Sequence, residues 1–145
     1  MEVRICYRDD SLVAVDKPAG IAVHPQEALL GSSASSGEVD LLRLVRDQVG
    51  AYVHPIHRLD RGTSGIVLFA LDSVSARHLC QQFYAGLVEK TYVAWVRGWA
   101  PDRGEITVPV KPGPRAGSER VPARTRFRVL SRFEFEKPVG RYASA

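Results

Sequence analysis

The feature that most constrains this chain is a cluster of polar, charged and glycine residues that runs directly into five apolar residues. The cluster is His57-Arg58-Leu59-Asp60-Arg61-Gly62-Thr63-Ser64-Gly65, and the apolar run is Ile66-Val67-Leu68-Phe69-Ala70. A short apolar run of this kind is typical of a buried strand, so we expect the polar cluster to lie at the mouth of a core strand. Binding and catalytic residues are often carried on segments that a rigid scaffold holds in this way.

Asp60 is the one carboxylate of the cluster, and arginines lie two residues before it and directly after it. Nearby positive charge favours the ionised carboxylate. An ionised and fixed aspartate can act as a nucleophile, a base or an ion-pair partner. The alternative is a surface loop in which the arginines and Asp60 simply pair with each other.

Length and composition fit a single domain or part of one. The chain has 145 residues, and 45% of them are hydrophobic. The formal charge of +4 is compatible with a polyanionic partner, although an excess of this size also occurs in proteins that bind no nucleic acid. The N-terminus has no apolar signal region and no apolar run is long enough to span a membrane, so we expect no membrane association.

Cysteine and histidine usage argues against a metal site and for a reducing compartment. Cys6 and Cys80 lack the spacing of a zinc site, and two distant cysteines do not make a disulfide scaffold. The histidines are not arranged with carboxylates or cysteines as a ligand set. We therefore expect no metal and a cytoplasmic location.

The order of periodic segments predicts both strands and helices. We expect strands at residues 3–7, 12–15 and 66–70, and a central strand at 88–96. A helix is expected from Asp40 to Gly50, and a second from the Asp72 cap to Gly86 with an apolar stripe in the core. Two further strands are expected at 104–110 and 123–130, with loops at 26–37 and 111–122.

Arginines alternate with less polar residues in the last expected strand. Arg124, Arg126 and Arg128 would occupy one face and the residues between them the other. Such a row could lie along a phosphate backbone, or it could be the solvated side of an antiparallel sheet.

Four motifs in the same order resemble the RluA family of pseudouridine synthases, which isomerise uridine in ribosomal and transfer RNA. The key match is the cluster around Asp60, which resembles the signature of that family around its catalytic aspartate. The other matches are Lys17-Pro18-Ala19-Gly20 with His24-Pro25, Lys90-Thr91-Tyr92-Val93-Ala94 with Val96-Arg97-Gly98, and Ala123-x-Thr125 with Phe127 and Val129. The sequence around Gln81-Gln82-Phe83 and Val96-Arg97-Gly98-Trp99 is most similar to the tRNA-modifying branch of the family.

The resemblance implies an α+β fold, in which a mixed and mainly antiparallel sheet is flanked by helices. We expect residues 1–145 to form a single, partial catalytic domain, because the chain contains no equivalent of the family's Gly-Arg-Thr-His-Gln-Leu-Arg stretch. An N-terminal S4 domain is not expected, since strand-like sequence begins at Val3. The implied partner is RNA, tRNA before rRNA, and we expect a monomer.

The resemblance also assigns roles to residues of the site. Asp60 would be the catalytic residue, Tyr92 the aromatic face that holds the flipped uracil, and Arg58 a residue that fills the space of the displaced base or holds RNA. For Tyr92 the alternative is a core tyrosine, and for Arg58 it is a local ion pair with Asp60. The residues expected to support the motif are His57, Leu59, Thr63, Ser64, Gly65, Lys17 and Pro18, with Lys17, Arg97 and the row of arginines as candidate phosphate contacts.

Two other functions remain open at this point. The chain could be an RNA-binding piece without activity, or a member that acts on rRNA. A hydrolase that uses Asp60 on a glycosidic bond is a third alternative, although no second carboxylate is placed as its acid partner.

Overall fold

The computed structural model describes residues 1–24, 39–111 and 119–134. The chain divides into two compact units, Met1–Thr91 and Tyr92–Ala145, which are called unit 1 and unit 2 below. The expected loop at 26–37 lies outside the described residues, as does most of the loop expected at 111–122.

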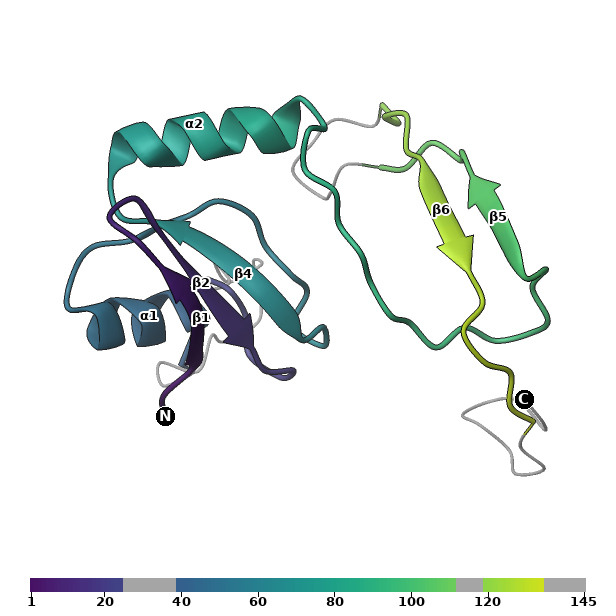
Figure 1. The fold of residues 1–145 in the computed structure, drawn as a ribbon, viewed down its shortest axis with the longest axis horizontal. Coiled ribbons are helices and arrows are strands. Elements are labelled where there is room, and N and C mark those ends of the chain that lie inside the picture. The colour runs from purple at the N-terminus through teal and green to yellow at the C-terminus, as the bar shows by residue number, and fades with distance from the viewer. Residues whose placement is uncertain (25–38, 112–118, 135–145) are drawn as a thin grey trace, which may run out of the picture. The chain divides into compact units, whose positions relative to one another are not determined.

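Unit 1 contains a four-stranded antiparallel sheet in the order β1-β2-β4-β3 (Figure 1). Its strands are β1 (Arg4–Arg8), β2 (Leu12–Lys17), β3 (His54–Pro55) and β4 (Gly65–Ala70). The β1–β2 turn is closed by Asp9, whose carboxylate accepts hydrogen bonds of 2.8 Å from the backbone N–H groups of Ser11 and Leu12. Aspartate favours turns because it can accept such local bonds. The three strands expected in this region are confirmed.

The inward face of the sheet is made by alternate residues of β2 and β4. Val13 lies opposite Phe69 and Val15 opposite Val67, and none of the four side chains is exposed to solvent. The core is completed by residues from outside the sheet, among them Val3, Leu41, Leu44, Val45, Val53 and Leu59. The apolar run after Asp60 is therefore a core strand, as the sequence indicated.

Helices α1 (Leu41–Val49) and α2 (Ser73–Tyr84) begin at the caps that the sequence predicts. The Asp40 carboxylate accepts from the Arg43 N–H at 2.9 Å, and the Asp72 carboxylate accepts at the start of α2. Helix α1 ends at Gly50 in the left-handed conformation, φ 71°, which glycine adopts without strain. Both helices are confirmed.

The apolar stripe of α2 was expected in the core, but it is less deeply buried than predicted. The helix packs against β3 and β4, yet no residue of α2 is fully buried. Its stripe is half-buried and consists of Ala76, Leu79, Cys80 and Phe83. Helical periodicity identifies the inward side of a helix, but the depth of burial depends on what covers that side.

The central strand expected at 88–96 is not formed. These residues have no strand assignment, and the side chains from Glu89 to Val96 are exposed. An alternating pattern gives a segment two usable faces, but a strand forms only when another strand supplies backbone hydrogen bonds. Within the described ranges, no strand pairs with this segment.

Unit 2 contains a two-stranded antiparallel ribbon, β5 (Arg103–Ile106) with β6 (Thr125–Arg128). An isolated bridge between Val110 and Val121 continues the pairing beyond the strands. The two strands were expected in this order but are shorter than predicted. The Phe127 ring lies over Gly104, where an added Cβ would come within 2.7 Å of ring atoms.

Candidate active site

Asp60 lies on the connection between β3 and β4, at the mouth of the core strand. Leu59 is buried, with 8% of its surface exposed, whereas Arg58 and Asp60 are exposed. Gly65 begins β4 with φ 129°, a conformation that strains any residue with a Cβ. Leu59 therefore anchors the connection, and its neighbours Arg58 and Asp60 project to solvent.

The backbone after Asp60 forms a tight turn that is joined to the turn after β2. The Thr63 N–H donates to the Asp60 carbonyl at 3.0 Å, so Thr63 supports the turn through its backbone. The Gly20 N–H donates to the Arg61 carbonyl at 2.7 Å, and Arg61 Nε donates back to the Gly20 carbonyl at 2.8 Å. This reciprocal pair of bonds fixes the Asp60 turn to the motif that contains Lys17 and Pro18.

Lys17 is the centre of that junction. Its register on β2 directs it inward with Val13 and Val15, and its side chain is completely buried. The amino group donates to the carbonyls of Pro18 and Ile21 at 2.9 Å and to that of Arg61 at 3.3 Å. Burial lowers the pKa of Lys17, and the negative charge of Asp60 opposes that shift. The expectation that Lys17 contacts phosphate is wrong, because its amino group is enclosed by backbone carbonyls.

His57 completes the ladder between β3 and β4 with its side chain. The Ile56 N–H donates to the Leu68 carbonyl at 3.1 Å, and the Leu68 N–H donates to His57 Nε2 at 3.2 Å. The ring also stacks on Phe83 of α2, with centroids 4.8 Å apart. Burial lowers the pKa of His57, which agrees with a neutral ring whose Nε2 accepts a hydrogen bond. The expected structural role of His57 has a clear geometric basis here.

A second histidine lies in the electrostatic environment of the same connection. Burial and the charge of Arg58 lower the pKa of His24, while Asp40 at the start of α1 opposes them. From the sequence, His24 could be identified only as part of the motif that begins at Lys17. Its link to Arg58 could be seen only in three dimensions, because 34 positions separate the two residues.

The expected site residues do not all lie in one unit. Unit 1 holds Lys17, Pro18 and the whole cluster from His57 to Gly65, whereas Tyr92 is the first residue of unit 2 and is 60% exposed. The alternative in which Tyr92 is a core tyrosine is therefore wrong for this structure. In the described part of the chain, Arg58 and Asp60 make no ion pair, so the alternative in which these two residues pair locally is wrong as well.

The described residues offer neither a metal site nor a membrane-spanning helix. Among residues 1–24, 39–111 and 119–134, no group of three or more histidine, cysteine, aspartate or glutamate side chains could hold a metal ion. In the same ranges, no helix combines the length and apolar character needed to cross a bilayer.

Comparisons with known proteins agree with this arrangement. A family model described as RNA pseudouridylate synthase matches residues 11–140. The tRNA pseudouridine synthase C of Haemophilus ducreyi is 40% identical over 154 residues, an alignment that covers 99% of this chain and 60% of the relative. The protein of the same name from Pasteurella multocida is 46% identical over 112 residues, covering 77% of this chain and 44% of the relative.

Solved structures of two human proteins share the fold. Human RNA pseudouridylate synthase domain containing 4 gives a TM-score of 0.62 at 23% identity, covering 89% of this chain and 54% of that chain. Human RNA pseudouridylate synthase domain containing 1 gives 0.65 at 20% identity, covering 86% and 51%. The α+β fold class is confirmed, and the chain spans about three fifths of the Haemophilus ducreyi relative.

Proposed function

Because this chain belongs to the RNA pseudouridylate synthase family, we propose that it carries the catalytic aspartate of an enzyme that isomerises uridine to pseudouridine in RNA. The observation that carries the proposal is the Asp60 turn. Its carboxylate is exposed, and its backbone is held by the buried Lys17 and by the reciprocal bonds between Gly20 and Arg61. A fixed backbone with an accessible carboxylate is what a nucleophile requires.

The isomerisation requires a fixed carboxylate and a rotation of the base. The bond between ribose C1′ and uracil N1 breaks, the base rotates, and C1′ bonds to C5. C5 then loses its proton and N1 gains one, so the product is an isomer of the substrate. A carboxylate can attack the sugar carbon or the pyrimidine ring and later leave as a weak base. Atoms and electrons balance without an oxidant or reductant, so the proposal includes no cofactor and no metal.

Tyr92 and Arg58 are proposed to contact the substrate. The exposed ring of Tyr92 is available to stack on a base that has left the helix. Arg58 is exposed beside Asp60 on the same held connection, where its guanidinium can occupy the space of the flipped base or contact RNA. His57, Leu59, Thr63, Ser64, Gly65, Lys17 and Pro18 support that connection in the proposal.

Transfer RNA is the proposed substrate, and ribosomal RNA the second choice. The relatives that align over nearly the whole chain carry the name tRNA pseudouridine synthase C. A cytoplasmic location and a monomeric state belong to the same proposal.

Mapping of pseudouridine tests both the reaction and the substrate. The 145-residue protein is incubated with bulk tRNA and, separately, with rRNA, both prepared from cells that lack the modification. We expect new pseudouridine in tRNA. Pseudouridine confined to rRNA would correct the substrate, and release of free uracil would replace the isomerase with a glycosidic hydrolase.

A second candidate is an RNA-binding protein that lacks activity by itself. One observation favours it, that the chain spans 60% of the Haemophilus ducreyi relative and 44% of the Pasteurella multocida relative. RNA binding without pseudouridine formation, in the same incubation, would support this candidate.

A further inference from the structure

The ribbon of unit 2 brings five charged residues together on one face. In the β5–β6 register, Arg103 lies opposite Arg128 and Glu105 lies opposite Arg126. Residues that oppose each other in an antiparallel pair point to the same side, so these four share a face. Arg124 reaches it from the position before β6, because its guanidinium lies 2.8 Å from the Glu105 carboxylate. We call this set of five residues the arginine face.

The arginine face is positive and exposed to solvent. Four arginines and one glutamate give it a formal charge of +3, and all five residues are exposed. The Arg124–Glu105 pair leaves 71% of the Arg124 side chain exposed, and exposed pairs of this kind contribute little to stability. Glu105 therefore neutralises one of the four positive charges and leaves the face with its net charge of +3.

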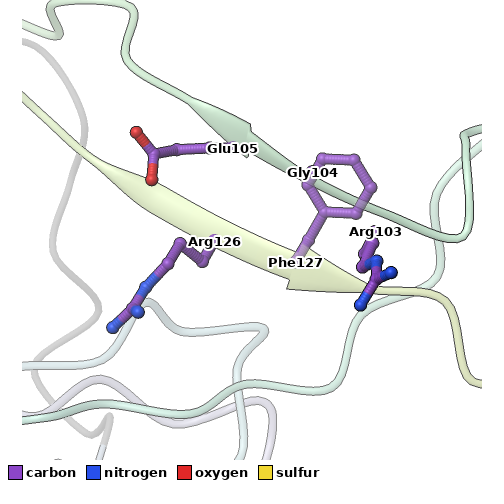
Figure 2. Close-up of a pocket in the computed structure, with 5 residues that line it drawn as sticks. All are labelled: Arg103, Gly104, Glu105, Arg126 and Phe127. Carbon is purple, nitrogen blue, oxygen red and sulfur yellow. The ribbon is translucent and has the colours of Figure 1, made fainter.

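Folding of the ribbon does not account for this arrangement. Arg103 and Arg128 are directly opposite each other, and like charges at opposed positions destabilise a strand pair. The contact that stabilises the ribbon is made by other residues, where the Phe127 ring lies over Gly104. Both of these residues, with Arg103, Glu105 and Arg126, line a shallow surface pocket (Figure 2). The five charged residues are nevertheless exposed to solvent on this face.

The spacing of the guanidinium groups suits a phosphodiester backbone. Alternate residues of a strand are separated by about 6.6 Å, so the arginines of β6 form a regular row. Each guanidinium presents a planar fork of donors that matches phosphate oxygens. A row of forks along an extended strand can follow successive phosphates without reading the bases.

We propose that the arginine face is a binding site for the phosphodiester backbone of RNA. The choice of RNA rests on the proposed function, whereas the chemistry rests on the ribbon itself. Backbone recognition of this kind positions the substrate and adds a strong salt dependence to its binding.

The test measures the affinity of the 145-residue protein for a labelled tRNA at several salt concentrations. The double variant Arg126→Gln with Arg128→Gln is compared with the charge-matched double variant Arg8→Gln with Arg43→Gln, whose residues are exposed on β1 and α1. We expect the ribbon variant to weaken binding at least about tenfold and to lower the salt slope by about 2. The matched control should retain most of the affinity.

Glu105→Gln is a second variant, for which we expect the opposite change in tRNA affinity. It removes the carboxylate from the arginine face, so we expect tRNA to bind about two to threefold more tightly. A ribbon that has lost its structure cannot produce a gain, and this variant therefore separates charge from folding. Equal affinity of the ribbon and control double variants, or no gain with Glu105→Gln, would overturn the proposal.

The outcome is independent of the proposed isomerisation. Pseudouridine formation is measured on the unaltered protein, and tRNA binding on the ribbon variants. Loss of binding without any isomerase activity would leave the arginine face in place and remove the proposed function. Isomerase activity of the unaltered protein, together with unchanged tRNA binding in the ribbon variants, would support the proposed function and overturn the arginine face as a binding site.

Discussion

The two units differ in what holds them together. Unit 1 encloses a core in which Val13, Val15, Val67 and Phe69 have no exposed surface. Unit 2 has no fully buried residue in its described part, and its tryptophans Trp95 and Trp99 are 78% and 67% exposed. The stability of this chain therefore comes mainly from unit 1, which also fixes the Asp60 turn. Unit 2 instead presents its side chains to solvent.

The largest difference in unfolding free energy is expected between two phenylalanine-to-alanine variants, one in each unit. Phe69→Ala in unit 1 removes a completely buried ring and should lower the free energy of unfolding by about 3–5 kcal/mol. Phe127→Ala in unit 2 removes a half-buried ring and should cost less than about 1.5 kcal/mol. Urea unfolding measures the two changes, followed by far-ultraviolet circular dichroism for unit 1 and by tryptophan fluorescence for unit 2.

The two spectroscopic signals separate the units. Both helices of the described residues belong to unit 1, and both tryptophans belong to unit 2. Phe127→Ala should alter tryptophan fluorescence and leave the helical signal unchanged. Equal losses of helical stability in the two alanine variants would contradict the contrast between the units.

Much of unit 1 could be predicted from sequence, because its signals are local. Asp40 and Asp72 cap helices with their own side chains, and the run from Ile66 to Ala70 is apolar enough to require burial. The strand expected at 88–96 failed for a different reason. A strand depends on a partner that may lie anywhere in a chain, and periodicity does not report whether one is present.

The site was predictable in part, for the same reason. The motif located Asp60 and its neighbours, but it could not show that Lys17 is enclosed by three carbonyls or that Arg61 bonds to Gly20. The contacts of Arg61 with Lys17 and Gly20 arise from the approach of turns that lie more than 40 positions apart in sequence, 44 and 41 respectively. The approach of Tyr92 to Asp60 stays a prediction.

The next largest difference in stability is expected between two lysine-to-methionine variants, one in each unit. Lys17→Met leaves three buried carbonyls without their donor and should lower the stability of unit 1 by about 1–3 kcal/mol. The matched change Lys111→Met, at an exposed position of unit 2, should stay within about 0.5 kcal/mol. Thermal unfolding monitored by the helical signal compares them. A neutral Lys17→Met would show that these bonds do not hold the Asp60 turn.

A smaller effect depends on pH and concerns unit 1. The pKa of His57 is lowered in the folded protein, so the unfolded chain binds more protons as the pH falls below about 6.5. The stability of unit 1 should therefore decrease between pH 7 and pH 5, by less than about 1.4 kcal/mol per pH unit for this half-buried group. Urea unfolding at each pH measures the slope, and His57→Gln should reduce it. An unchanged slope in His57→Gln would contradict the role of the neutral ring.

The smallest effect concerns the ribbon. Gly104→Ala places a Cβ against the Phe127 ring, but this half-buried ring can turn aside, so we expect a change in unfolding free energy below about 1 kcal/mol. Tryptophan fluorescence during urea unfolding should report it, and the helical signal should not. A loss of helical signal in this variant would show that unit 1 depends on the ribbon.

Asp60 is proposed as the nucleophile that unit 1 presents, and pseudouridine formation by two aspartate variants tests this role. Pseudouridine formation in tRNA is compared between Asp60→Asn and the matched variant Asp10→Asn, an exposed aspartate in the turn at the opposite end of the sheet. If Asp60 is the nucleophile, Asp60→Asn abolishes isomerisation while tRNA binding persists, and Asp10→Asn behaves like the unaltered protein. Isomerisation that survives in Asp60→Asn would contradict it.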